Sequence, residues 1–267
     1  MKLKNYNENY AVLFHHFHDK KLFYKSPGSL EKKKFSQFVK LNKKKISSSK
    51  NFLENFDKKK KLISLSFDDG LKCQYNLALP VLEKAKIKAF FFIPTSIFNN
   101  KKLSFEVIRY LKYKYFSDVN KFYKIFIDHI NKNQKLKKKL KKNINKLFNK
   151  IKTESPYYTK LDIEHKIIRD YLITENDYNK VILSIIKKKK IDIKKIHKKL
   201  FMSKKNISKL FKLGHTIGLH SHSHNFQFHK LNYNQELREY KKNKLLLENI
   251  LQSKINIASY PFGYQTE

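Results

Sequence analysis

The chain has 267 residues, of which 40% are hydrophobic and 14% aromatic, enough for one large domain or two small ones with a sizeable core. Its single cysteine, Cys73, excludes an internal disulfide and any cysteine-rich zinc module. No apolar run approaches the roughly 20 residues that span a bilayer, and the first residues lack the features of a secretory signal. We therefore expect a folded cytoplasmic protein without a transmembrane segment.

The formal net charge of +38 is typical of proteins that bind nucleic acid or anionic surfaces. Almost all of this charge comes from lysine, whereas arginine is the residue favoured for bidentate contacts to phosphates and bases. The excess of Lys, Asn, Ile, Phe and Tyr favours a composition bias towards A/T-rich codons. We therefore predict no specific nucleic acid partner. A basic protein that binds nucleic acid or an anionic surface is kept as an alternative that the charge alone supports.

The first hundred residues alternate short apolar runs with polar, lysine-rich segments. The lengths of these runs and the residues that bound them predict a parallel β/α arrangement. The expected strands lie at residues 11–14, 61–67 and 88–94, and the expected helices at 30–44 and 77–87.

Residues 101–200 have a different sequence pattern: long lysine-rich segments in which apolar residues lie three or four positions apart. This pattern predicts a mostly helical insertion, whose lysine runs are solvated helix faces. Strand-like alternation resumes at residues 213–224, followed by a helix at 232–251 and a last strand at 255–263.

Four histidines lie close together in the segment "HTIGLHSHSH". His220 and His224 are four residues apart, a spacing that puts both side chains on one face of either a strand or a helix. They can therefore converge on one metal ion, and His222 joins them only if the segment is extended. By spacing alone a surface histidine pair is an equally open interpretation, and we expect His215 to be structural.

Two further segments follow predicted strands. In "SFDDG", Asp68 and Asp69 stand where a parallel β/α fold keeps its site, at the carboxyl end of a strand. Adjacent residues point in different directions there, so that one carboxylate can bind a metal while the other handles a proton. An Asp-Gly turn that caps a helix is the alternative. In "SYPFG", the loop can present the Phe262 N–H to a developing oxyanion, or it is simply a turn.

The order "SFDDG", "HSHSH", "SYPFG" resembles the polysaccharide deacetylase family of chitooligosaccharide deacetylase-like carbohydrate esterases. Its signatures are a (T/S)FDDG, an H(S/T)xxH and an RxPYG-like segment, and "VLFHHFHD" is similar to its first barrel strand, with His15 at the usual histidine. The resemblance implies an α/β fold, a distorted, incomplete (β/α) barrel. Its first part would be residues 1–100, the helical insertion 101–200 and its second part 201–267.

The resemblance also implies roles for individual residues. Asp69, His220 and His224 would bind a divalent metal ion, of which zinc is the first candidate. Asp68 would be the general base, and the Phe262 N–H would stabilise the oxyanion. The remaining implied residues are Ser221 and Ser223, which would support the loop, and Pro261 and Tyr264, which would contact the substrate.

The implied function is a hydrolase that removes an N-acetyl group from an amino sugar or glycan precursor, by attack of metal-bound water on the amide carbonyl. The substrate we expect is a nucleotide- or lipid-linked sugar intermediate. Two departures support an alternative, a catalytically impaired or truncated family member that binds glycan or a partner protein. Ser259 stands where the family usually has an arginine, and the family's later Asp-containing and Leu-x-His segments have no counterpart. The Leu-x-His segment would supply the general acid. His15, His16 and His18 are candidate substitutes for it, although we expect each of them to have a structural role.

Overall fold

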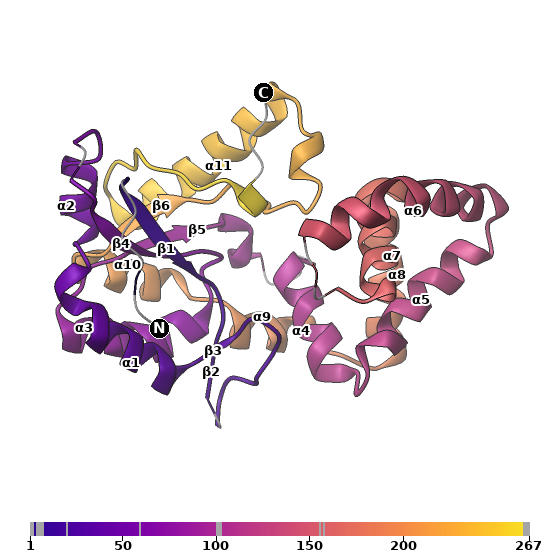
Figure 1. Ribbon diagram of the computed structural model, residues 1–267, viewed down its shortest axis with the longest axis horizontal. Helices are drawn as coiled ribbons and strands as arrows, with labels where there is room; N and C mark the ends of the chain where they lie inside the picture. The colour runs from indigo at the N-terminus through magenta and orange to yellow at the C-terminus, as the bar shows by residue number, and fades with distance from the viewer. Residues whose placement is uncertain are drawn as a thin grey trace. The chain divides into compact units, whose positions relative to one another are not determined.

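The computed structural model describes residues 3, 8–19, 21–58, 60–99, 103–154, 156 and 158–263. The chain divides into two compact units. We call them the α/β unit, Met1–Ser104 with Lys194–Glu267, and the helical unit, Phe105–Ile193. The α/β unit contains both ends of the colour scale in Figure 1. The three-part domain boundaries expected from the sequence stay a prediction.

The α/β unit is built on one parallel sheet of four strands in the order β1-β4-β5-β6. Because all four strands run the same way, their carboxyl ends meet at one edge of the sheet. Within the described residues the sheet does not close into a barrel, since β1 and β6 are its two outer strands. The strands are β1 (Tyr10–Phe14), β4 (Ile63–Phe67), β5 (Phe90–Ile93) and β6 (Thr216–Leu219), with a separate parallel pair of β2 (Phe17–His18) and β3 (Leu30–Glu31).

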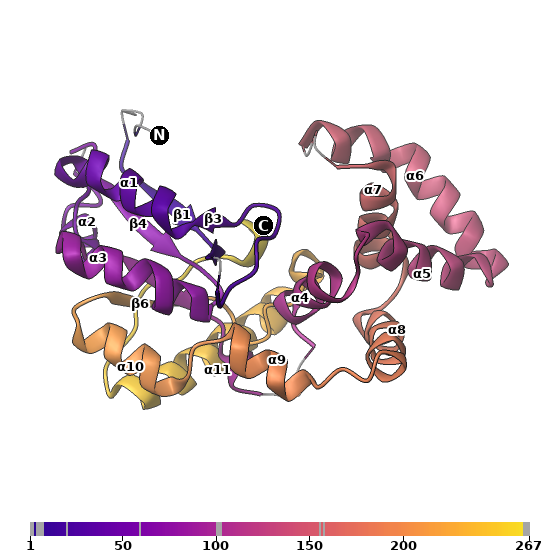
Figure 2. The same ribbon diagram turned by 90° about the horizontal axis from the view of Figure 1, so that it is seen from below.

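Helices connect the strands and cover the sheet, with α1 against α3 and α10 against α11 (Figure 2). Helix α3 continues directly from a π-helical turn, and its proline lies just after that turn. The α-helices are α1 (Lys32–Asn42), α2 (Ser49–Glu54), α3 (Leu79–Ala85), α9 (Ile193–Leu200), α10 (Lys204–Lys212) and α11 (Tyr233–Leu251). The shorter turns are η1 (Lys43–Lys45), η2 (Gln74–Ala78), η3 (Thr95–Phe98), η5 (Phe228–Lys230) and η6 (Pro261–Gly263).

The core of the α/β unit is a cluster of phenylalanine rings around β4, which is buried along its whole length. The Phe67 ring stacks on Phe91 of β5 at a centroid distance of 4.8 Å and on Phe14 of β1 at 5.6 Å. Phe35 of α1 packs edge-on against it at 6.1 Å. Burial on both faces is typical of a parallel sheet covered by helices.

The helical unit has an apolar interior and a lysine-rich exterior. In α5, residues Phe122, Phe126 and Ile130 are fully buried at helical spacing, while the lysines of the same helix are exposed. Its helices are α4 (Phe105–Tyr115), α5 (Val119–Asn131), α6 (Gln134–Glu154), α7 (Lys160–Ile167), the π-helical η4 (Ile168–Leu172) and α8 (Glu175–Lys188).

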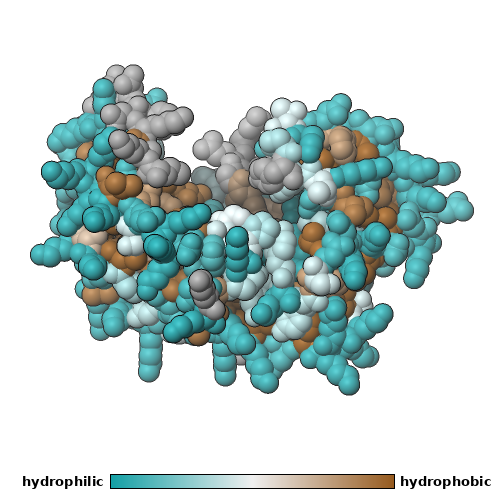
Figure 3. Space-filling view, turned by 60° about the horizontal axis from the view of Figure 1, so that its bottom comes forward, coloured by the Kyte–Doolittle hydropathy of each residue, from teal (hydrophilic) through white to brown (hydrophobic). Residues whose placement is uncertain are grey.

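The lysine-rich composition therefore resides on the surface, and hydrophilic residues cover most of the visible face in Figure 3. Among the described residues, no helix combines the length and apolar character needed to cross a membrane.

The elements expected from the sequence are largely confirmed, with two corrections near the carboxyl end. The strand expected over 213–224 ends at Leu219, so the histidines after it lie in a loop. The strand expected over 255–263 is wrong: the segment pairs with β6 only through the bridge between Leu219 and Ala258. Two backbone hydrogen bonds, Leu219 N to Ile257 O (3.0 Å) and Ser259 N to Leu219 O (2.9 Å), do not extend into a ladder.

Phe67 gives a test of the core. Phe67→Ala would remove a ring with no exposed surface and leave a cavity, so we expect the free energy of unfolding in urea to fall by about 3–5 kcal/mol. Phe56→Ala is the matched control, because Phe56 is 57% exposed, and it should cost about 1 kcal/mol or less. Equal losses for the two variants would contradict this description of the core.

Candidate metal centre

Two motifs that are far apart in the sequence meet at the carboxyl edge of the sheet. Asp69 follows β4, and His220 and His224 follow β6. All three side chains are buried, and one potential ligand atom from each lies within 4.8 Å of the other two. The Nε2 atoms of His224 and His220 lie 3.1 Å and 3.5 Å from the same oxygen, Oδ1 of Asp69.

The orientation of His220 makes its Nε2 atom available as a ligand. Its Nδ1 atom lies 2.9 Å from the carbonyl oxygen of Ser259, so the ring donates its Nδ1–H there and turns the Nε2 lone pair towards Asp69. Apart from these two rings, Asp69 Oδ1 has no hydrogen-bond partner within the described part of the chain. Two imidazole nitrogens and one buried carboxylate oxygen are a donor set that fits a divalent cation.

The charges of the cluster support one another. Burial by itself would raise the pKa of Asp69, but His224 and His220 outweigh it and hold that pKa well below its usual value. Burial lowers the pKa of His220, whereas its contacts with Asp69 and Asp68 outweigh burial and raise it. The carboxylate of Asp69 is therefore ionised and ready to bind a cation.

The backbone is strained at the same place. Four residues of the predicted site other than glycine have a positive φ: Asp69 (75°), Ser221 (55°), His224 (48°) and Phe262 (59°). Such conformations cost of order 1–3 kcal/mol each and persist only where the surrounding structure enforces them. Gly70 completes the aspartate turn at φ +61°, where an added Cβ would lie 2.9 Å from Ile97 Cδ1.

Asp68 lies beside the three candidate ligands, but its two oxygen atoms have different partners from those of Asp69. Its Oδ2 atom is 3.7 Å from His220 Nε2 and accepts a 3.3 Å hydrogen bond from the Ser259 hydroxyl, while its Oδ1 atom has no partner among the described residues. Burial raises the pKa of Asp68, and His220 partly offsets this effect. The serine at position 259 thus provides one long hydrogen bond to Asp68 and no charge.

The two serines that were expected to support the loop make different contacts. Ser221 uses its hydroxyl oxygen, which accepts the His224 N–H at 3.1 Å. Ser223 uses its backbone, whose N–H donates to Oε2 of Glu239 at 2.6 Å. Glu239 and Asn243 of α11, which both bind this loop, were not predicted; the available signal is two polar residues four apart in the expected helix at 232–251.

The third motif also reaches the site. Phe262 is 39% exposed, and its ring lies 4.8 Å from the ring of His224. Pro261 is buried next to it. Tyr264, the other expected substrate contact, lies outside the described residues.

The other histidines of the segment do not join the cluster. His215 Nδ1 accepts the Ala89 N–H at 3.1 Å and its Nε2–H donates to Glu83 Oε1, which is a structural arrangement. His222 lies within hydrogen-bond distance of the Thr95 hydroxyl, at 2.8 Å, because the loop is not extended there.

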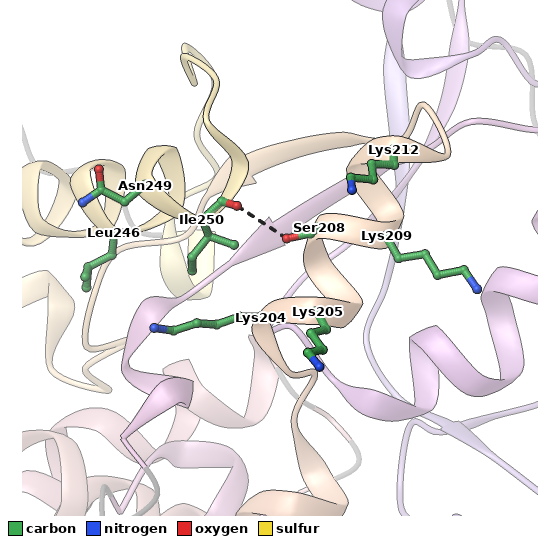
Figure 4. A pocket seen from close by; sticks show the side chains of 8 residues that line it. All are labelled: Lys204, Lys205, Ser208, Lys209, Lys212, Leu246, Asn249 and Ile250. Atoms are coloured by element: carbon green, nitrogen blue, oxygen red, sulfur yellow. Dashed lines mark hydrogen bonds between the residues drawn. The ribbon is translucent and has the colours of Figure 1, made fainter.

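A separate groove in the α/β unit gathers lysines. It lies between α10 and α11 and has a volume of about 740 Å³. Figure 4 shows the lysines of α10 fanning out in different directions around it, and Ser208 reaching the Ile250 carbonyl at 3.5 Å. Because no carboxylate or histidine lines this groove, it lacks the groups that the aspartate–histidine cluster offers. Its lining is Lys204, Lys205, Ser208, Lys209, Lys212, Leu246, Asn249 and Ile250.

The fold and the cluster define an α/β protein with a candidate metal centre at the carboxyl edge of a parallel sheet. The family model described as polysaccharide deacetylase matches residues 55–115 and 170–267, more than half of the chain, and these ranges include both aspartates and both clustered histidines. The chain belongs to the polysaccharide deacetylase family. Most of the helical unit, residues 116–169, lies outside the match.

Solved structures show the same fold. One is the Streptococcus pyogenes deacetylase PplD in complex with acetate, with 13% identity and a TM-score of 0.51 over 96% of this chain and 75% of that one. Another is IcaB from Ammonifex degensii, with 14% identity and a TM-score of 0.51 over 98% and 77%. The predicted fold class is therefore confirmed, whereas no curated protein matches the sequence.

Removal of single histidines tests the cluster. The wild-type chain should bind one equivalent of Co²⁺ or Zn²⁺, and His224→Ala should weaken binding by more than the roughly 10- to 100-fold that loss of a supporting partner costs. His129→Ala is the control, because His129 is exposed in the helical unit. Titration calorimetry measures both, and unchanged affinity in His224→Ala would exclude this residue as a ligand.

Proposed function

We propose that this chain is a metal-dependent hydrolase that removes an N-acetyl group from an amino sugar or glycan precursor. The observation that carries the proposal is the convergence of Asp69, His220 and His224 in a chain of the polysaccharide deacetylase family. In the reaction, the oxygen of water bonds to the amide carbonyl carbon and the C–N bond breaks, which yields acetate and the free amine.

The candidate cofactor is a divalent cation held by Asp69, His220 and His224. Zinc is the first candidate. When bound there, it would polarise the amide carbonyl and lower the pKa of a water molecule. The support is the chemistry of the donor set, because two imidazole nitrogens and one carboxylate oxygen leave one position open in a four-coordinate site.

Asp68 is the proposed general base. Its Oδ1 atom is free of hydrogen bonds within the described residues, so it can take a proton from the attacking water, and Ser259 restrains its other oxygen. The Phe262 N–H is the proposed oxyanion donor, which the position of Phe262 beside His224 supports. Pro261 and Tyr264 are the proposed substrate contacts.

A nucleotide- or lipid-linked intermediate and a cytoplasmic location stay predictions, which cell fractionation and a panel of acetylated sugars would test. The alternative function, glycan or partner binding without turnover, predicts metal binding in the absence of acetate release.

The main experiment measures acetate. Purified protein with Zn²⁺ or Co²⁺ should release acetate from N-acetylated glucosamine oligosaccharides, and Asp69→Ala should abolish the release because the cation is lost. Asp57→Ala should keep full activity, because Asp57 is exposed on the α/β unit. A wild type that binds no divalent metal would refute the proposal, and tight metal binding without turnover would favour the alternative function.

Asp68→Asn separates proton transfer from metal binding. We expect kcat to fall by roughly 10²- to 10⁴-fold, since the amide cannot accept the proton, while the affinity for Zn²⁺ stays within a few-fold of the wild type. Ser259→Ala should have a smaller effect, because it removes one 3.3 Å hydrogen bond and keeps the base. Full activity in Asp68→Asn would exclude this residue as the base.

A further inference from the structure

The two candidate histidine ligands lie in a loop without regular backbone hydrogen bonding. We call residues 220–224 the histidine loop. It follows β6 directly, and Ser221 and His224 within it have positive φ values. Buried backbone N–H groups in such a loop need partners from elsewhere, and a strained backbone needs restraints that hold it.

Helix α11 supplies two of these partners, and it contacts β6 in the α/β unit (Figure 1). Oδ1 of Asn243 accepts the backbone N–H of His220 at 2.9 Å. Oε2 of Glu239 accepts the backbone N–H of Ser223 at 2.6 Å. Glu239 and Asn243 are four residues apart, which puts both side chains on one face of the helix.

Asn243 is itself held in place from the other side. It has no exposed surface, and its amide nitrogen donates to the Ile93 carbonyl oxygen at 3.0 Å and to the Thr95 hydroxyl at 3.1 Å. An amide can accept and donate at the same time, which neither an aspartate nor an aliphatic side chain can do. Asn243 therefore ties the end of β5 to the first residue of the histidine loop.

The turn η3 also binds the loop. The Ser96 N–H donates to the His222 carbonyl oxygen at 2.8 Å, and the Ser96 hydroxyl contacts the Ser223 carbonyl oxygen at 3.4 Å. Both η3 and α11 thus hold the histidine loop through its backbone.

We propose that Glu239 and Asn243 are positioning residues for the metal centre, and this rests on the proposed function. Two hydrogen bonds set the direction of the His220 ring. The backbone N–H of His220 donates to Asn243, and the ring Nδ1–H donates to the Ser259 carbonyl oxygen. Glu239 holds Ser223, the residue before His224, and so supports the strained backbone from which His224 faces Asp69. Without these contacts the loop relaxes and the two Nε2 atoms separate.

The test is a titration of the full chain with Co²⁺, followed by the cobalt absorption bands and by thermal unfolding. Asn243→Ala and Glu239→Ala should each raise the Co²⁺ dissociation constant by roughly 10- to 100-fold and alter the cobalt spectrum, because ligand geometry changes. Glu239→Gln keeps an acceptor oxygen and should recover most of the lost affinity.

Two variants on the same helix serve as controls. Leu247→Ala truncates a fully buried apolar side chain that has no polar atom to bond the loop, so it should lower the unfolding temperature and leave the Co²⁺ affinity unchanged. Asn249→Ala changes the same residue type at an exposed position and should alter neither.

The outcomes separate the two proposals. A wild type that binds Co²⁺ together with Asn243→Ala and Glu239→Ala variants that bind it equally well would overturn the positioning role alone. A loss of affinity in Leu247→Ala as large as that in Asn243→Ala would also overturn it, because the effect would then follow stability. A wild type that binds no Co²⁺ would overturn the proposed function and the positioning role with it.

Discussion

Two buried carboxylates at the end of an apolar strand are the constraint on which this structure depends. A charged carboxylate removed from water is costly unless it is paired with opposite charge or a cation. Asp69 meets this requirement through His220 and His224, whose Nε2 atoms face one of its oxygens. Asp68, next to it, has one oxygen that is restrained and one without a partner among the described residues.

The pairing of Asp69 determines the architecture around it. Parallel β4 and β6 are separated only by β5, so their carboxyl ends lie close enough for residues about 150 positions apart in the chain to meet. The histidine loop leaves β6 with positive φ values at Ser221 and His224, and hydrogen bonds to η3 and α11 hold it there. The paired carboxylate, the strained loop and the hydrogen bonds that restrain it thus lie together at this edge of the sheet.

The large positive charge of the chain has little part in this site. The lysines lie mainly on solvated surfaces, including the groove between α10 and α11 and the outer faces of the helical unit. The site instead uses buried aspartates and histidines, whose mutual effects are strong because water is excluded. The lysine-rich composition therefore reflects the surface of this protein, whereas the aspartate and histidine motifs supply the groups of the candidate metal centre.

Hydrophobic periodicity and motif spacing are local properties, so the sequence was enough to predict the parallel β/α alternation, the family, and Asp68, Asp69, His220 and His224 as candidates. It also predicted a strand at 255–263 that the structure replaces with a single bridge, since a strand needs a partner that periodicity cannot supply. The contacts of Asn243, Glu239 and the Ser259 carbonyl with the histidine loop could be found in the folded structure alone. These are contacts between residues remote in the chain, and their side chains carry no signal until the folded sheet brings them together.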